Sequence, residues 1–380
     1  MAGLYVHIPF CRSRCIYCDF YSTTREAELP RYVAALCGEI RSRRHELADA
    51  PVRTIYIGGG TPSLLAPGQL RCILDEIRAD YAVDEGAEVT VEMNPDDVVR
   101  TRGCTACPAG HGAALRFPFN RVSLGVQTFD DGLLRRLRRR HDALTAVGAV
   151  RELQRAGVAN ISIDLIYGLP GQTLELWSRD LDVAFGLGVQ HLSAYALSYE
   201  PGTLLARQRL RGEVQEAPEE LSVAMYELLC RRAREAGFVH YEISNFALPG
   251  FLSRHNSGYW TGEAYLGFGP GAHSYDGQRT RRANAADLDA YLRDPAAGGE
   301  REVLSDDELY DEAVLCGLRT CRGIDLDAIA SRFGNRRRDL LLEAARPHLL
   351  RGRLVLSQGR MTLAHDAIMT SDDIMSDLMA

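Results

Sequence analysis

The sequence contains no lysine, so all 44 basic residues among its 380 are arginines. With abundant alanine and glycine, this absence is typical of a GC-rich coding bias and indicates no particular function. The 51 acidic residues outnumber the arginines and leave a net charge of −7. A chain with this charge lacks the strongly basic surface that attracts nucleic acid. We therefore expect no nucleic-acid partner.

Long apolar runs are missing as well, because no stretch approaches the roughly 20 residues that a membrane-spanning helix needs. Residues 1–10 lack the basic start and the long apolar core of a signal peptide. The sequence therefore predicts a cytoplasmic protein without a transmembrane segment, and it leaves room for peripheral contact with a membrane. In the cytosol the ten cysteines would stay reduced, which argues against a disulfide framework.

Three cysteines stand within eight residues, where Cys11, Cys15 and Cys18 form the spacing C-x3-C-x2-C directly after an expected strand. A 4Fe–4S cluster normally takes four thiolates, so three leave one iron open. An open iron can chelate an amine and a carboxylate, as in the methionine part of S-adenosylmethionine (SAM). An electron from the cluster can then cleave the sulfonium and form a 5′-deoxyadenosyl radical, a chemistry that the cofactors themselves carry. The motif predicts a radical SAM protein.

Two other interpretations of the three cysteines carry less weight. Buried core cysteines should lie on an apolar face, whereas these stand in a loop with Arg, Ser and Tyr. A zinc site is the second alternative, but the spacing is not one of the usual zinc patterns.

Short β-like runs alternate with helical patterns over the first 237 residues. The expected strands cover residues 3–8, 54–57, 88–92, 121–125, 160–165 and 191–197, and the expected helices cover residues 31–47, 68–80, 133–156, 174–185 and 219–236. This alternation is typical of an α/β fold with a parallel sheet and right-handed crossovers. Six such units would form either an open sheet or a partial barrel, and periodicity does not separate the two.

The pattern weakens after residue 237. Residues 240–274 are rich in Gly, Tyr and Asn and predict loops, and residues 278–300 resemble a polar connection. Helical patterns return at Ser305, with Asp325 as a helix cap, a helix over 340–350 and a hairpin around Gly359. We expect a barrel over residues 1–237, a loop-rich connection over 238–300 and a small winged-helix-like domain over 301–380. Because the chain is acidic, we expect this last domain to pack against the barrel and not to bind DNA.

Residues 101–117 stand where a crossover helix is expected but show no helical periodicity. They contain Cys104 and Cys107 in a C-x2-C spacing, with His111 nearby. Structural zinc usually takes four ligands, and no second pair is obvious. We favour a divergent or frame-shifted stretch, with a second metal site as the alternative.

Polar residues and glycines recur at the ends of the expected strands. The second strand ends in the run GGGTP at 58–62, and later strands bring Glu92 with Asn94, Gln127, and Asp164. In barrels of this kind the chemistry gathers at the carboxyl ends of the strands. Glycine lets the backbone approach a ligand closely, and an acidic residue can accept hydrogen bonds from ribose hydroxyls. Each residue alone could be a helix cap or a turn residue, but together they predict a cofactor site.

These residues resemble the oxygen-independent coproporphyrinogen III oxidase family of radical SAM proteins. The matching stretches lie in order along the chain, at residues 5–11, 58–62, 91–95, 123–129 and 163–170. The resemblance implies a partial (β/α)6 TIM-type barrel with a C-terminal accessory domain, a 4Fe–4S cluster and SAM. Carried over by position, the cofactor-binding residues are Tyr5, Tyr17, Gly59, Gly60, Thr61, Glu92, Gln127, Arg139 and Asp164. For Arg139, which lies in a run of three arginines, a solvated helix face is the alternative.

The family has two branches, and the chain is more similar to the second. The oxidase branch typically shows a fourth Cys two residues after the third, and an N-terminal arm. The heme chaperone branch binds heme, passes it to other proteins and carries the motif H-N-x-x-Y-W. Here Asp19 and Phe20 follow Cys18, only ten residues precede Cys11, and residues 255–260 have the sequence HNSGYW. The resemblance therefore implies a heme chaperone, with heme and heme-accepting proteins as its partners.

His255 is the predicted heme ligand, because imidazole is a common axial ligand of heme iron. Tyr259 and Trp260 add flat apolar faces, and His273 is a second candidate ligand. A loop histidine that is hydrogen-bonded to backbone is the alternative. Two alternative functions stay open. One is the oxidase reaction, which decarboxylates two propionates to vinyls, and the other is a radical SAM reaction on another substrate.

Overall fold

The structure is a computed structural model, and it describes residues 1–47, 50–100, 118–295 and 299–380. The segment 101–117, with Cys104, Cys107 and His111, lies outside these ranges, so both interpretations of it stay predictions.

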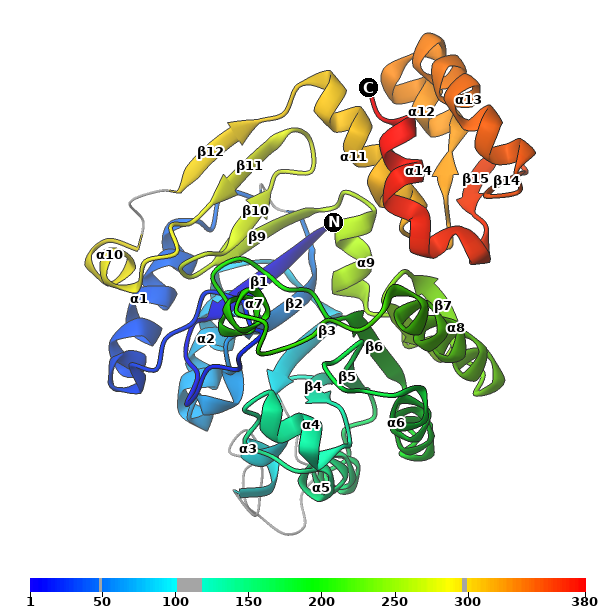
Figure 1. The fold of residues 1–380 in the computed structure, drawn as a ribbon. Helices are drawn as coiled ribbons and strands as arrows, with labels where there is room; N and C mark the ends of the chain where they lie inside the picture. The colour runs from blue at the N-terminus through cyan, green and yellow to red at the C-terminus, as the bar shows by residue number, and fades with distance from the viewer. Residues whose placement is uncertain (48–49, 101–117, 296–298) are drawn as a thin grey trace.

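Six parallel strands form the centre of the molecule (Figure 1). They are β1 to β6, and they cover Ala2–Ile8, Val52–Gly59, Val83–Met93, Arg121–Gln127, Ile161–Tyr167 and His191–Ala196. Each pairs in parallel with the next, and burial is nearly continuous along β1 and β5, as in strands covered on both faces. No pairing joins β1 to β6, so the described strands form an open arc. The predicted partial barrel of six βα units is confirmed.

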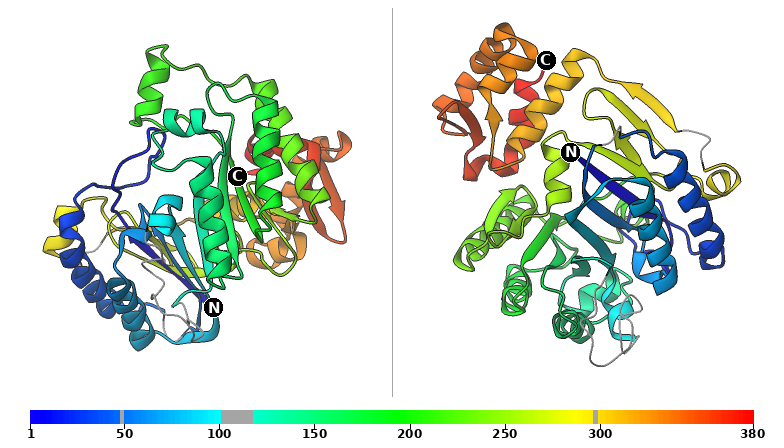
Figure 2. Two further views of the ribbon diagram at one scale, coloured as in Figure 1. Left: turned by 90° about the horizontal axis from the view of Figure 1, so that it is seen from below. Right: turned by 180° about the vertical axis from the view of Figure 1, so that it is seen from behind.

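Helices cover the outer side of this arc, as the views in Figure 2 show. Two short helices, α4 (Asp131–Arg136) and α7 (Leu204–Leu210), instead lie beside the cysteine loop, where Ile16 forms backbone hydrogen bonds with Leu137 and Leu205. The short 3-10 helices η1 (Glu26–Glu28) and η2 (Pro62–Leu64) precede α1 and α2. The outer helices are α1 (Leu29–Ser42), α2 (Pro67–Asp80), α3 (Pro95–Arg100), α5 (Ala143–Arg155), α6 (Leu174–Gly186) and α8 (Glu219–Glu235). Their apolar faces pack on the strands, and Leu36, Ile57 and Leu74 are fully buried in this core. Each such side chain stabilises the fold by roughly 1.5–3 kcal/mol.

The prediction of a single helix over residues 133–156 is wrong, because the structure forms two helices, α4 and α5, with a turn between them. Arg138 takes a left-handed conformation in this turn, with φ of 58°. The buried His141 then lies with Nε2 3.1 Å from the carbonyl oxygen of Val126. The break turns Arg139 towards the barrel interior, which a continuous amphipathic helix would not allow.

The loop-rich interpretation of residues 238–300 is also wrong, because this part of the chain extends both edges of the sheet (Figure 1). Its elements are β7 (Val239–Glu242), β8 (Asn245–Ala247), α9 (Arg254–Trp260), β9 (Ala264–Phe268), β10 (His273–Tyr275), β11 (Thr280–Ala283), α10 (Leu288–Arg293) and β12 (Glu300–Val303). Strand β9 pairs in parallel with β1, and β8 pairs antiparallel with β6. A Cβ atom at Gly267 would meet the backbone of His273, so a glycine that suggested a loop instead permits close strands. The domain boundaries at 237 and 300 stay predictions.

The last part of the chain has its own apolar core, which includes Val314, Ile329, Leu341 and Met361. Its elements are α11 (Asp306–Leu318), β13 (Ile324–Asp325), α12 (Leu326–Phe333), α13 (Asn335–Leu350), β14 (Leu354–Ser357), β15 (Arg360–Leu363), η3 (His365–Thr370) and α14 (Ser371–Leu378). Helices followed by the β14–β15 hairpin are the winged-helix-like arrangement that the sequence predicted. The cap is confirmed, since the Asp325 carboxylate accepts hydrogen bonds from two backbone N–H groups of α12. In the described part of the chain, no helix has the length and apolar character to cross a membrane.

Candidate functional site

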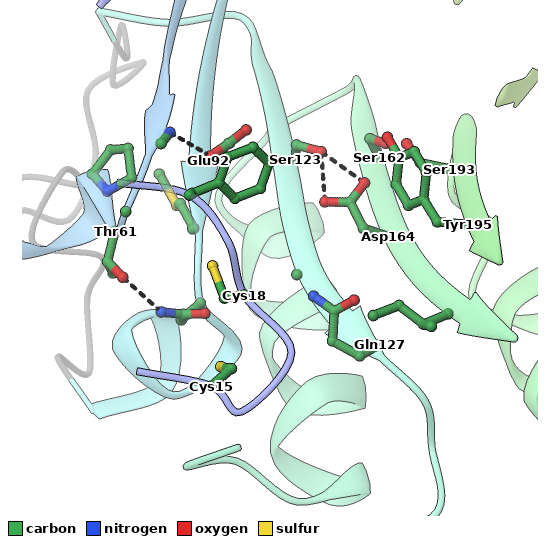
Figure 3. A pocket seen from close by; sticks show the side chains of 18 of the residues that line it. Cys15, Cys18, Thr61, Glu92, Ser123, Gln127, Ser162, Asp164, Ser193 and Tyr195 are labelled. Carbon is green, nitrogen blue, oxygen red and sulfur yellow. Dashed lines mark hydrogen bonds between the residues drawn. The ribbon is translucent and has the colours of Figure 1, made fainter. Parts of the chain in front are cut away.

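A cavity of about 530 Å³ opens inside the arc of strands. It brings together residues that are far apart in the sequence, because parallel strands present their carboxyl ends at one edge. All thirteen residues predicted to bind metal or cofactor line it, namely Cys11, Cys15, Cys18, Tyr5, Tyr17, Gly59, Gly60, Thr61, Glu92, Gln127, Arg139, Asp164 and His255. Figure 3 shows Cys15, Cys18, Glu92 and Asp164 around this space.

The cysteine loop follows β1 and is fixed at its base and its middle. At the base, the N–H of Thr23 donates to the carbonyl of Pro9 and the N–H of Cys11 to that of Thr23, at 2.7 and 2.9 Å. In the middle, the carbonyl of Ile16 accepts from the N–H of Leu205 at 2.9 Å. The three thiols carry no disulfide. Burial raises the pKa of Cys18 to about 11, so this side chain is a thiol until a metal displaces its proton.

Arg139 brings a positive charge into contact with the cysteine loop. One of its terminal nitrogens donates to the sulfur of Cys15 at 3.3 Å, and the other donates to Asn94 Oδ1 and Gly125 O at 2.7 and 2.6 Å. Its Nε is buried without a hydrogen-bond partner among the described residues. Burial raises the pKa of Cys11, and the positive charge of Arg139 opposes that rise; the thiolate is the form that binds iron. The solvated-helix alternative for this arginine is therefore excluded by its position.

Glycines at the end of β2 bring the backbone to the cavity wall. Gly59 has a φ of 103°, which favours glycine, and a Cβ there would meet the ring of His7. At Gly60 a Cβ would lie 2.7 Å from the carbonyl oxygen of Ile8. Next to them, Thr61 Oγ1 donates to Cys11 Sγ at 3.4 Å and accepts from Asn94 Nδ2 at 3.2 Å. The glycine turn and the cysteine loop thus form one continuous wall.

Two acidic side chains line the cavity, Glu92 from β3 and Asp164 from β5. Glu92 accepts from the hydroxyl of Tyr56 at 2.7 Å and from the N–H of Gly59 at 3.0 Å. Burial raises the pKa of Glu92 to about 7 and that of Asp164 to about 6, and the Asp164 charge adds to the shift of Glu92. Both side chains are partly exposed, and the exposed part of each faces the cavity. A pair of carboxylates that holds its charge with difficulty when empty is suited to a cationic ligand.

Gln127 stands at the end of β4 in a strained conformation. Its φ of 72° is unusual for a residue other than glycine, and the pairing of β4 with β5 shifts register just before it. Such strain often marks a functional position, because the surrounding structure must hold it. In Figure 3 its amide lies on the cavity side of β4.

Sequence analysis missed a row of serines on the neighbouring strands. Ser123, Ser162 and Ser193 line the cavity, and the hydroxyl of Ser123 donates to Asp164 at 3.1 Å (Figure 3). Ser162 Oγ contacts His191 Nδ1 at 2.7 Å. The available signal was a small polar residue in each of three apolar strands, facing inward where a bulky residue would fill the barrel.

His255 lies at the far wall of the cavity, on α9. Its Nδ1 contacts Thr54 Oγ1 and its Nε2 contacts the Tyr259 hydroxyl, both at 2.8 Å. The ring stacks on Tyr56 with centroids 5.1 Å apart. Burial lowers the pKa of His255 to about 3, so the imidazole is neutral. His273, the second candidate, is exposed on β10.

A three-cysteine loop after β1, a glycine turn after β2 and inward polar groups on a partial (β/α)6 barrel define a radical SAM protein. The pattern of the radical SAM superfamily matches residues 5–184, and that of the HemN C-terminal domain matches residues 304–367. The chain belongs to the HemW family.

Two relatives and one solved structure show how far the likeness extends. The heme chaperone HemW of Mycobacterium tuberculosis (strain ATCC 25618 / H37Rv) is 37% identical over 377 residues, which cover 96% of this chain and 93% of the relative. That of Bacillus subtilis (strain 168) is 34% identical over 384 residues and 98% of both chains. Among solved structures, coproporphyrinogen III oxidase (HemN) from Escherichia coli has a TM-score of 0.81 and 22% identity, and covers 100% of this chain and 90% of its own. This last likeness supports the fold alone.

The site fits the 4Fe–4S cluster and the SAM that the radical SAM class implies. Three free thiols line the cavity, and one of them, that of Cys15, accepts a hydrogen bond from Arg139, whose Nε lacks a partner in the described structure. Gly59 and Gly60 line the cavity, and burial raises the pKa values of the carboxyls of Glu92 and Asp164, so a positively charged ligand would favour their ionised forms. SAM supplies such charge through its sulfonium and its ammonium group.

Proposed function

We propose that the protein binds heme and delivers it to acceptor proteins, and that it carries a SAM-ligated 4Fe–4S cluster. The observation that carries this proposal is identity of 34–37% over nearly the whole chain to proteins named heme chaperones. The acceptors, a cytoplasmic location and any peripheral contact with a membrane belong to the same proposal.

A departure in the cysteine loop supports the chaperone over the oxidase. Phe20 stands where the oxidase branch carries its fourth cysteine, and it lines the cavity with 61% of its surface exposed. An aromatic ring exposed at the cavity wall can contact a flat apolar ligand.

In this proposal Cys11, Cys15 and Cys18 hold the cluster. Tyr5, Tyr17, Gly59, Gly60, Thr61, Glu92, Gln127, Arg139 and Asp164 line the SAM site. When bound, the cluster would supply the electron that cleaves the sulfonium in radical SAM chemistry. Arg139 donates a hydrogen bond to the sulfur of Cys15, and Glu92 and Asp164 offer negative charge to SAM.

We also propose His255 as the heme ligand. A neutral imidazole is the form that ligates a metal, and burial keeps His255 in that form. A hydrogen bond between Thr54 Oγ1 and Nδ1 fixes the orientation of the ring, as hydrogen bonds to the second ring nitrogen do in metal-ligating histidines. The Tyr259 hydroxyl contacts Nε2, so it must turn away before that nitrogen can reach iron.

This competition predicts opposite effects of two substitutions. His255→Ala should weaken heme binding at least about tenfold, because it removes the ligand. Tyr259→Phe should strengthen heme binding roughly threefold to tenfold, because it removes a hydrogen bond of about 1 kcal/mol that competes with the iron. Titration with heme, followed by the Soret absorbance, measures both.

His273→Ala is the matched control, because this histidine is exposed on β10. Its heme affinity should equal that of the unmodified protein. Unchanged affinity in His255→Ala would show that the ligand is another residue. If Tyr259→Phe weakened binding as much as His255→Ala, the two side chains would shape the cavity wall without either one ligating iron.

Turnover separates the chaperone from the oxidase. The reconstituted protein, supplied anaerobically with coproporphyrinogen III, SAM and a reductant, should form no protoporphyrinogen. Product formed over many turnovers would make the protein an oxidase and overturn the proposed function.

A further inference from the structure

A thiol and two imidazoles meet at the boundary between the barrel and the C-terminal domain. Cys230 belongs to α8, His240 to β7, and His365 begins η3. One ligand atom from each lies within 4.8 Å of the others. Figure 1 shows α8 and β7 beside the C-terminal domain, away from the cysteine loop.

Two of the three side chains are already held in place by the barrel. His240 stacks on Phe246 with ring centroids 4.2 Å apart, and its Nε2 lies 3.2 Å from the carbonyl oxygen of Ile243 and 3.3 Å from the hydroxyl of Tyr226. Cys230 is buried in α8. Contacts of this kind orient the ligands of a metal site before the metal arrives.

The third side chain comes from the other domain and faces solvent. His365 is exposed, and its ring lies 6.4 Å from that of His240, centroid to centroid. Packing within the barrel explains the positions of Cys230 and His240, but it does not explain why a histidine of η3 lies beside them. The exposed side gives an ion a route to the buried thiol.

Thiolate and imidazole are the ligands that Zn²⁺ prefers, whereas Ca²⁺ and Mg²⁺ take oxygen. With Zn–S of about 2.3 Å and Zn–N of about 2.0–2.1 Å, tetrahedral ligand atoms stand roughly 3.3–3.6 Å apart. The three donor atoms, which lie within 4.8 Å of one another, therefore need to approach by at most about 1.2–1.5 Å. We propose that Cys230, His240 and His365 bind one Zn²⁺, with water as the fourth ligand.

Zinc at this place would join the two domains. Their present boundary holds backbone hydrogen bonds from Ile243 to Arg319 and from Cys321 to Tyr241, both 3.1 Å long. A Zn²⁺ ion bound to α8, β7 and η3 adds a second link between the same two domains, through a different segment of the C-terminal one. Binding releases one proton, which leaves Cys230 for solvent as the Zn–S bond forms.

The experiment measures zinc in iron-reconstituted protein, because iron then occupies Cys11, Cys15 and Cys18. After incubation with Zn²⁺ and gel filtration against a weak chelator, metal analysis should give one zinc per chain. His365→Ala should weaken zinc binding at least about 100-fold, because loss of even an outer partner costs 10- to 100-fold. Its exposed position keeps this substitution from disturbing either core.

The exposed His45→Ala is the matched control and should keep its zinc. Co²⁺ in place of Zn²⁺ should give a sulfur-to-metal charge-transfer band that Cys230→Ser lacks. Zinc should raise the Tm of the unmodified protein but not that of His365→Ala. Equal zinc content in the unmodified protein and His365→Ala would overturn the proposal, as would copper binding without zinc binding. Neither result depends on heme or SAM.

Discussion

Cys15→Ala protein should emerge from anaerobic reconstitution with almost no iron. The unmodified protein should hold about four irons per chain, the content of one 4Fe–4S cluster. Three thiolates are the minimum for a cluster that keeps one iron open, so the loss of one removes a third of its protein ligands. The substitution also removes the sulfur to which the guanidinium of Arg139 donates a hydrogen bond. Iron analysis and visible absorption measure the result.

Cys321→Ala is the matched control for this loss. Cys321 is exposed in the C-terminal part of the chain, and the hydrogen bond from its backbone N–H to Tyr241 does not involve the thiol. Its iron content should match that of the unmodified protein. If Cys15→Ala retained four irons, the assignment of the cluster to the loop after β1 would be wrong.

Glu92→Gln should lose SAM affinity and gain thermal stability. Burial raises the pKa of Glu92 from its ordinary 4.5 to about 7, so the folded protein holds this proton more tightly than the unfolded chain does. Stability therefore falls as pH rises from about 4.5 to about 7, and the cost persists above pH 7. Glutamine carries no charge to bury, so at pH 8 the variant without ligand should be more stable by up to roughly 3.5 kcal/mol, for a shift of about 2.5 pKa units at about 1.4 kcal/mol each. Thermal unfolding without ligand measures this gain.

The same ionisation sets how SAM affinity depends on pH. The carboxylate attracts a cationic ligand, so below about pH 7 binding must first expel a proton from Glu92. Affinity of the unmodified protein should fall by up to about tenfold per pH unit there, since one pKa unit is one factor of ten. Glu92→Gln should bind SAM at least about tenfold more weakly at pH 8 and keep only the dependence below about pH 6 that belongs to Asp164.

The matched control is Glu85→Gln, which changes an exposed carboxylate at the other end of the same strand. It should alter neither the Tm nor SAM binding. A Glu92→Gln protein with full SAM affinity would remove this residue from the proposed site, whatever its stability.

The central sheet and most of the site could be predicted because their signals are local. Each parallel strand is a short apolar run, and several predicted contacts stand at or near a strand end, as Gly59 and Gln127 do. The helix cap at Asp325 could be predicted for the same reason, since a cap contacts residues only two and three positions away.

The structural features that the sequence did not predict all depend on contacts between residues far apart in the chain. The break between α4 and α5 places Arg139 beside Cys15, a residue of the first loop. The edge strands β9 and β10 contain glycines that suggest loops until the close approach of Gly267 to His273 is known. The buried environment of His255, between Thr54 and Tyr259, likewise requires the tertiary structure.

The pairing of β1 with β9 has a consequence for the newly made chain. Ala2 pairs with Ala264 and Val6 with Phe268, so the strand that leads into the cysteine loop finds its second neighbour about 260 residues later. At 5–20 residues per second, the ribosome needs on the order of tens of seconds to supply it. Until then one edge of β1 exposes unpaired N–H and C=O groups, and the three cysteines emerge without the wall that will surround them. We therefore expect iron to be inserted after translation. A nascent chain that stalls before β9 would contain the three cysteines but not the complete cluster site.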